Sequence, residues 1–277
     1  MALPLQHAHR GLSRPARLAS DAAGYAVGGV LGAVAALRRA KAVHPMGAVH
    51  QADLVTTGHP GPAAGGSLFE SAGEHSAVVR FSRSLGLPRP LPDLLGMSLR
   101  VLDAYGPGIH QDFLMVTSVD APILHHIFVP ASDVWLRPYS SSLPYTAGGR
   151  RFIVGAVPGS GSPRPEGSDE LERLAKAAAT GRLAFDLAVA APMGRFQPVG
   201  ELRVGPPLAD GADALRFNPF NTGGGIEPVG VLNRLRDYAY PMSQRAWAST
   251  GPEGAQQAAE VEVERAGKPD RLGAASR

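Results

Sequence analysis

The sequence of 277 residues contains no cysteine. This absence excludes disulfides, thiolate nucleophiles, iron–sulfur clusters and cysteine-ligated zinc sites, although it leaves the cellular compartment open. Charged residues are also scarce, at 18%, and the formal net charge is only +3. Because this small excess forms no basic stripe interleaved with aromatic residues, we expect no binding of nucleic acid.

Apolar residues make up 44% of the chain, which is enough for a sizeable core, and 34 glycines and 25 prolines indicate many turns between short strands. Helices are expected over 169–180, where acidic residues open the segment and Gly181 ends it, and over 231–250. The fold class is therefore α+β, with an antiparallel barrel or curled sheet and helices at its ends. The strands that the apolar pattern predicts are 77–81, 97–101, 113–116, 185–189 and 200–204.

The N-terminal region is basic and then apolar, with an uncharged stretch from Ala22 to Leu37. This stretch is shorter than the roughly 20 residues of a membrane-spanning helix. A secretory signal peptide would begin in the same way, so export stays open. We favour a helix that packs on the domain or on a second subunit, with peripheral membrane contact as an alternative. The expected organisation is an N-terminal helix over 1–40, a main domain over 41–250 and a polar tail over 251–277.

Most short motifs that could carry chemistry are absent or incomplete. There is no H-E-x-x-H segment, no cluster of carboxylates and no EF-hand loop. The adjacent pair His125 and His126 would point to opposite faces of a strand, which argues against joint metal ligation. The stretch 155–168 is rich in Gly, Pro and Ser and is expected to be a surface loop, so it holds no nucleophile elbow. The three glycines at 223–225 are expected to form a tight turn before a helix rather than a phosphate loop.

Arg236 and Tyr240 are four residues apart on the expected helix over 231–250, so they share one face. A phenol titrates near pH 10, but a guanidinium at its oxygen and a ferric ion both favour the phenolate. The pair could therefore supply an anionic oxygen ligand for iron. Taken alone, the same spacing is more typical of a solvated helix face with a buried ring.

Four segments, in order, resemble motifs of the haem catalase superfamily. The distal V-H-A-K-G segment is matched by residues 43–47 (VHPMG), and R-F-S by residues 80–82. F-x-P-x-N followed by G-I-E-P is matched at 217–221 and 225–228. The proximal segment R-x-x-x-Y-P-x-x-x-R is filled at every fixed place from Arg236 to Arg245. The resemblance covers about residues 36–250 and is strongest to the short catalase-related peroxidases.

This resemblance implies a catalase-like antiparallel β-barrel core with flanking helices, and a haem between the barrel and a C-terminal helix. Because the chain has no cysteine, the cofactor would be non-covalent haem b. Tyr240 becomes the proximal ligand of the iron, and Arg236 becomes its charge partner. His44 becomes the distal acid–base group, with Ser82 orienting its imidazole.

The remaining assignments concern the rim of the haem pocket. Arg80 is implied as the partner of a haem propionate, and Lys41 stands where the family usually has arginine. Lysine supplies a positive charge there but cannot form the bidentate hydrogen bonds of an arginine. Val43 would line the distal channel, and Arg245 matches a family arginine near the propionates.

One departure bears on the substrate, because full catalases carry a distal Asn that the stretch 111–118 lacks. Thr117 lies nearest to that position in a loose alignment. We therefore expect a haem oxidoreductase that uses hydrogen peroxide or organic hydroperoxides with a small organic or lipid partner. The alternatives are a fatty-acid hydroperoxide lyase or isomerase of the same fold, and a haem- or lipid-binding protein without turnover. A homo-oligomer such as a dimer, located in the cytoplasm or associated with a membrane, is also expected.

Overall fold

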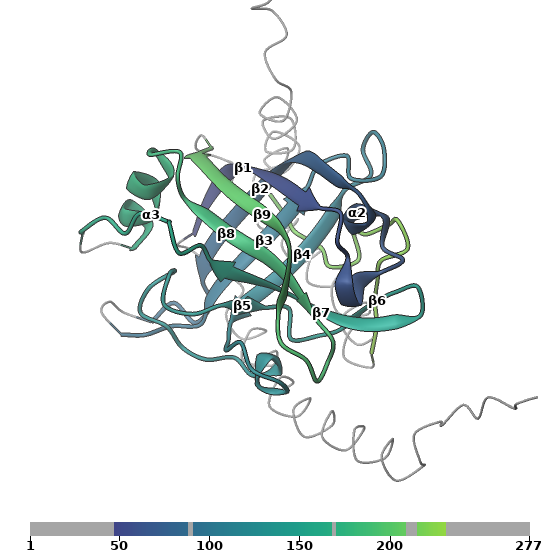
Figure 1. Cartoon of the computed structure of the whole chain (residues 1–277). Helices are drawn as coiled ribbons and strands as arrows, with labels where there is room; N and C mark the ends of the chain where they lie inside the picture. The colour runs from purple at the N-terminus through teal and green to yellow at the C-terminus, as the bar shows by residue number, and fades with distance from the viewer. Residues whose placement is uncertain (1–46, 88–90, 168–169, 209–214, 231–277) are drawn as a thin grey trace, which may run out of the picture. The chain divides into compact units, whose positions relative to one another are not determined.

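The computed structural model describes residues 47–87, 91–167, 170–208 and 215–230 (Figure 1). The described strands are β1 (Gly47–Thr57), β2 (Ala72–Arg83), β3 (Leu95–Val101), β4 (Gln111–Thr117), β5 (Tyr139–Ser140), β6 (Tyr145–Ala147), β7 (Arg150–Pro158), β8 (Ala184–Ala190), β9 (Gln197–Pro207) and β10 (Glu227–Pro228). The described helices are η1 (Gly61–Ala63), α2 (Ser67–Glu70), η2 (Leu124–His126) and α3 (Glu170–Ala178). Strands therefore dominate this part of the chain, as the many turn residues predicted.

Eight of the strands close into an antiparallel barrel. Their order is β7-β5-β4-β3-β2-β1-β9-β8, and β7 pairs with β8 to complete the ring. β6 and β10 extend the sheet beside β7. A closed barrel leaves its eight strands without an open edge, which explains how these short strands form a stable sheet. The predicted antiparallel barrel is confirmed.

Strict alternation along the strands decides which side chains enter the barrel. In β2, Val79 and Phe81 are buried in the main core cluster, while Arg80 between them and Ser82 after them are only partly buried. The same period of two places Met97 of β3 and Phe113 of β4 inside. Aromatic contacts fill the interior, for example Phe81 and Phe185, whose ring centroids lie 5.6 Å apart. The described interior of the barrel is thus a core of contacting apolar side chains.

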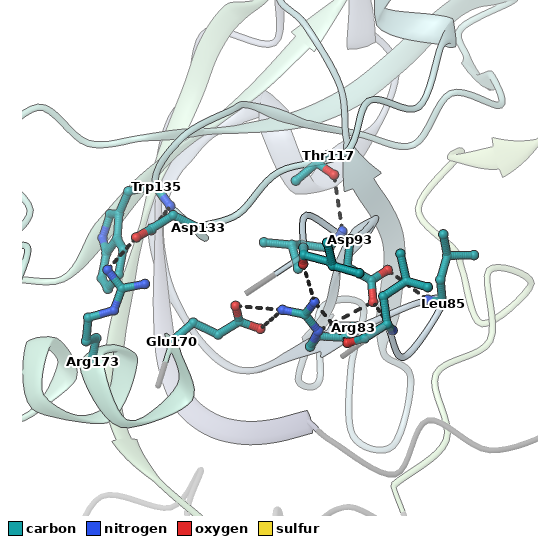
Figure 2. A network of polar contacts seen from close by, with 11 residues as sticks. Arg83, Leu85, Asp93, Thr117, Asp133, Trp135, Glu170 and Arg173 are labelled. Atoms are coloured by element: carbon teal, nitrogen blue, oxygen red, sulfur yellow. Dashed lines mark hydrogen bonds and ion pairs between the residues drawn. The ribbon is translucent and has the colours of Figure 1, made fainter. Parts of the chain in front are cut away.

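A buried ion-pair network fastens loops to the barrel at the end of β2 (Figure 2). Arg83 Nη1 donates to both carboxylate oxygens of Glu170 on α3, each at 2.9 Å. Its Nε lies 3.4 Å from Asp93 Oδ2, and Asp93 accepts backbone N–H bonds from Leu85 and Leu87 at 2.9 and 3.1 Å. Because all three charged side chains are buried, each depends on the others to stay paired.

A second contact holds α3 on the loop that precedes β5 (Figure 2). Arg173 Nη1 lies 2.7 Å from Asp133 Oδ2, and its guanidinium sits over the ring of Trp135 at 6.0 Å. Asp133 also accepts the backbone N–H of Trp135 at 2.9 Å. The predicted helix over 169–180 is observed as α3, and the predicted pairing of 185–189 with 200–204 is observed between β8 and β9.

Two local predictions are wrong. The stretch from Gly155 to Pro158 belongs to β7, because its pairing with β5 and β8 outweighs its Gly- and Pro-rich composition. His125 and His126 lie on the 3-10 helix η2, not on a strand, and their ring centroids are 4.6 Å apart. The glycines at 223–225 do form a turn, with Ile226 N donating to Gly223 O, and β10 follows it.

The expected helices over 1–40 and 231–250, the tail over 251–277 and both domain boundaries lie outside the described residues. They therefore stay predictions. Within the described ranges, every helix is too short or too polar to cross a bilayer.

Candidate cofactor-binding face

Arg80 and Ser82 lie on the outer face of β2, two residues apart and on the same side of the strand. These are the two predicted site residues that the structure describes. The other six lie outside the described residues: Lys41, Val43, His44, Arg236, Tyr240 and Arg245. The structure therefore describes one wall of the predicted site.

The register of four strands places a row of small side chains around Ser82. Gly47 of β1 and Gly96 of β3 pair with Ser82 from either side, and Gly96 pairs in turn with Val116 of β4. Partners in register point to the same face of a sheet. The row Gly47–Ser82–Gly96–Val116 therefore crosses the outer face, and two of its four members have no side chain.

The two glycines make room for their neighbours. A Cβ on Gly96 would lie 2.9 Å from Ser82 Oγ, and a Cβ on Gly47 would lie 2.8 Å from Arg80 Nη2. The Ser82 hydroxyl and the Arg80 guanidinium thus fold back over the backbone of the adjacent strands. A larger residue at either glycine would push a polar group off this face.

The hydroxyl of Ser82 can form a hydrogen bond with a further group. It is partly exposed, and no hydrogen bond to its Oγ is present within the described part of the chain. A serine hydroxyl donates one hydrogen bond and accepts up to two. Ser82 can therefore orient an imidazole placed over the row.

Around this row the outer face is apolar. Val78 and Val49 are buried in a second hydrophobic cluster with Leu215 and Phe217, and Leu114 packs against this cluster. The cluster lies on the opposite side of β1–β4 from the main core, because its members alternate with the core residues. The segment that carries Leu215 and Phe217 therefore covers Val49 and Val78 on this face.

A buried ion pair pins the segment 216–221 to this face. Arg100 of β3 and Asp112 of β4 pair in register and form two bonds of 2.7 Å, while Arg100 Nη2 also donates to Arg216 O. Asp112 accepts the N–H of Asn218 at 2.8 Å and the amide of Asn221 at 3.2 Å. The F-x-P-x-N motif is therefore held by the carboxylate of Asp112, and this positions the start of the C-terminal region.

The G-I-E-P segment is held by a second polar group. Gln111 Oε1 accepts from Tyr105 Oη and from Thr222 Oγ1, both at 2.8 Å. Burial raises the pKa of Tyr105, so its hydroxyl stays protonated and donates. Ile226 is fully buried, and β10, which follows it, pairs with β6. Both motifs of the C-terminal half thus have a structural role at the barrel wall.

The residue that faces Ser82 from β4 is Val116, whereas the loose sequence alignment favoured Thr117. Thr117 points to the other side of the strand, where its Oγ1 accepts the N–H of Leu95 at 3.2 Å and its side chain is fully buried. A shift of one residue along a strand moves the side chain to the opposite face of the sheet. The outer face at this position is therefore apolar.

Sequence reasoning did not identify Arg100, Asp112 and Val116 as parts of this face. The alternation of apolar residues over 97–101 and 113–116 could have indicated that Ser98, Arg100 and Leu114 share one face. It could not have revealed the pairing of Arg100 with Asp112, which depends on the register between two strands. Over the described ranges, no group of three or more His, Asp or Glu residues is placed to hold a metal ion.

No protein-family model matches the sequence. No curated protein matches it either. Among solved structures, the chain is similar to a bacterial catalase, with a TM-score of 0.56, 15% identity and coverage of 73% of this chain and 56% of that chain. It is also similar to a fungal catalase, with a TM-score of 0.59, 14% identity and coverage of 87% and 66%.

These comparisons establish the fold, which is that of the catalases: a closed antiparallel barrel of eight strands with few helices among the described residues. The chain spans less than two thirds of the length of either catalase, at 56% and 66%.

Proposed function

We propose that the protein is a haem-dependent oxidoreductase related to catalases, which reduces hydroperoxides and oxidises an organic donor. The observation that carries this proposal is the row Gly47–Ser82–Gly96–Val116 with Arg80 beside it, on a catalase-type barrel. Noncovalent haem b, when bound, would supply the redox chemistry of an iron centre. The chain would supply orientation, charge and a proton carrier.

The described residues fit such a group. The two glycines leave the outer face free of Cβ atoms on both sides of Ser82. Leu114, which is only partly buried, offers apolar contact, and Arg80 offers a cation for a propionate. The face therefore combines the two properties that a macrocycle with carboxylate arms requires.

His44 precedes Gly47 by three residues, and Gly47 pairs with Ser82. Three steps of 3.8 Å limit the separation of the Cα atoms of His44 and Gly47 to about 11 Å. The length of the connecting chain therefore keeps His44, the proposed acid–base group, near the row. In this role His44 takes a proton from the hydroperoxide and returns it to the leaving oxygen, while Ser82 holds the other ring nitrogen.

The iron ligand would be Tyr240, with Arg236 favouring the phenolate form. Two tyrosines of the described barrel are poor candidates. Tyr105 and Tyr139 both donate hydrogen bonds, to Gln111 and to the Val134 carbonyl, and burial raises the pKa of each. A raised pKa opposes the phenolate that an iron ligand needs, so these two residues support the assignment to Tyr240 by contrast.

Val116 favours organic hydroperoxides over hydrogen peroxide as the oxidant. Hydrogen peroxide is small and polar, so its orientation depends on hydrogen-bond donors at the wall. Val116 offers none, and its neighbour Leu114 on the same face is also aliphatic. An alkyl hydroperoxide would gain apolar contact at these positions instead.

The test is haem binding followed by kinetics on matched variants. The purified protein should contain, or take up, haem that acid–acetone extracts completely, with a spectrum typical of a phenolate ligand. Tyr240→Phe should lose or alter that spectrum and Tyr238→Phe should keep it. If the purified protein does not bind added haemin, the proposal is wrong.

Kinetic measurements then address the chemistry. His44→Ala should retain haem and consume cumene hydroperoxide about 10²- to 10⁴-fold more slowly, as expected for a general acid–base group. Ser82→Ala should lower the rate less. Val116→Asn should raise the rate with hydrogen peroxide relative to cumene hydroperoxide, and Thr117→Val serves as the matched control on the opposite face. Product analysis with a fatty-acid hydroperoxide separates the alternatives, since an epoxide or aldehyde indicates a lyase or isomerase.

A further inference from the structure

Four apolar side chains are exposed where η2 meets the turn between β8 and β9. Ile123, Leu124 and Ile127 have exposed fractions of 44, 47 and 42%, and that of Met193 is 67%. The ring of His126 joins the two segments, with Nδ1 2.7 Å from Ser142 O and Nε2 3.2 Å from Pro192 O. We call Ile123, Leu124, Ile127 and Met193 the η2 patch.

The η2 patch is presented by a well-anchored turn. Ser118 Oγ donates to Ile127 O at 2.7 Å, which ties the end of η2 back to the end of β4. Below the patch, the buried ring of His125 stacks 5.5 Å from Phe196, and Phe196 lies directly over Gly155 of β7. Because this layer is packed on the barrel, the aliphatic side chains project from a fixed base.

The backbone conformation of Ile123 is strained. Its φ angle is +68° and its ψ angle is −42°, a combination that is unfavourable for a β-branched residue. Such strain is normally offset by burial of the side chain, yet 44% of Ile123 is exposed. An isoleucine that is both strained and exposed points to a contact with something outside the chain.

The surroundings of the η2 patch are basic. Arg195, whose side chain is 68% exposed, follows Met193 by two residues, and its Nη1 lies 3.9 Å from Asp120 Oδ2. Asp120 also accepts the N–H of Phe196 at 3.1 Å. On the other side of the same turn, Arg150 and Arg151 share a cleft with Ala191 and Gln197. These three arginines outnumber the one carboxylate that the described contacts place at this turn.

The size and composition of the patch distinguish a bilayer from a second copy of the chain. Four side chains about half exposed amount to a few hundred Å² of apolar surface. A stable protein interface buries roughly 800 Å² on each partner and is enriched in aromatic residues. The η2 patch is smaller, consists of aliphatic residues on two turns and lies beside arginines, which suits shallow insertion below anionic headgroups.

We propose that the η2 patch docks the protein on an anionic lipid bilayer, with its aliphatic side chains at the headgroup boundary and Arg150, Arg151 and Arg195 on lipid phosphates. This proposal stands independently of haem binding. It assigns the membrane contact to a packed part of the barrel domain.

The experiment uses the full chain and vesicles of phosphatidylcholine, with and without about 30% phosphatidylglycerol, in co-sedimentation. The patch variant combines Ile123→Gly, Leu124→Ser, Ile127→Ser and Met193→Ser; glycine accepts the positive φ at 123. The matched control is Leu136→Ser, because Leu136 is 58% exposed elsewhere on the surface. We expect binding to anionic vesicles to fall by at least tenfold in the patch variant and to stay unchanged in the control.

The lack of cysteine allows a second, site-specific measurement. An environment-sensitive label on Leu124→Cys should shift to the blue when anionic vesicles are added, whereas the same label on Leu136→Cys should not. Unchanged binding of the patch variant would overturn the proposal, because the full chain would then bind through another segment. Loss of self-association in the patch variant, seen by size-exclusion chromatography without any vesicle binding, would overturn it in favour of a second copy.

Discussion

The inner and outer faces of β2 and β4 are made by neighbouring residues that meet different surroundings. Phe81 and Phe113, on the inner face, are 1% and 0% exposed and contact other aromatic rings. Ser82 and Leu114, the next residues along, lie on the outer face and are only partly buried. At these positions the inner face belongs to the main core, while the outer face leaves side chains partly exposed. Pairs of substitutions in one strand, with one residue on each face, test this difference between the two faces.

The largest effect is expected for Phe113→Ala. The ring of Phe113 lies 6.2 Å from that of Phe69 and 5.5 Å from that of Tyr145, so its removal leaves a cavity in the core. The free energy of unfolding should fall by about 3–5 kcal/mol, measured by urea denaturation. Leu114→Ala, one residue away on the outer face, should cost less than about 1.5 kcal/mol. Equal losses in the two variants would mean that both faces are core.

The arginines of β2 offer a second matched pair. Arg83→Met should lower the free energy of unfolding by about 3 kcal/mol, because Glu170 and Asp93 would stay buried without their cation. Arg80→Met should change it by less than about 1 kcal/mol but weaken haem binding in a haemin titration. If Arg80→Met destabilises the protein as much as Arg83→Met, Arg80 is a structural residue.

Phe196 covers the outer face of β7 at Gly155, and the buried His125 beside Phe196 should make this region sensitive to pH. Burial and the neighbouring His126 lower the pKa of His125 to about 4, below the ordinary 6.5. The unfolded chain therefore binds the proton first, so stability is complete above about pH 6.5 and falls as the pH drops toward 4. The loss amounts to about 2–3 kcal/mol at the acid end of this window.

Urea denaturation at pH 7.0 and pH 4.5 measures this effect. His125→Gln should reduce the difference between the two pH values, whereas His59→Gln, at an exposed position, should leave it unchanged. The buried His50, whose pKa burial also lowers, contributes in the same direction and keeps some pH dependence in both variants. A His125→Gln variant with the full pH dependence would assign the effect to His50.

The smallest effect on stability is expected on the outer row itself. Gly96→Ala should change the free energy of unfolding by less than about 1 kcal/mol, because alanine favours the strand while its Cβ displaces the Ser82 hydroxyl. Haem affinity should nevertheless fall about tenfold, as one orienting group is pushed aside. Gly205→Ala on β9 is the control, since its Cβ would meet only ordinary contacts of 3.4 Å and more. Similar haem affinities for both variants would remove Gly96 from the binding face.

Local patterns were sufficient for much of the fold. The alternation at 97–101 and 113–116 predicted strands because one side of each is buried, and the acidic start and glycine stop predicted α3. The same patterns failed where tertiary pairing outweighs composition. Residues 155–158 look like a loop but are a strand, because β5 and β8 bond them on both edges.

The sequence by itself determined the order of the motifs, the lack of any thiol chemistry and the alternation that makes a barrel wall. It also placed Arg80 and Ser82 on one side of a strand, because side chains two residues apart always share a face. Only the tertiary structure decided that Gly47, Gly96 and Val116 join Ser82 in one row. The reason is that register arises from hydrogen bonds between segments 14 to 35 residues apart, and a slip of one residue would have put Thr117 in place of Val116.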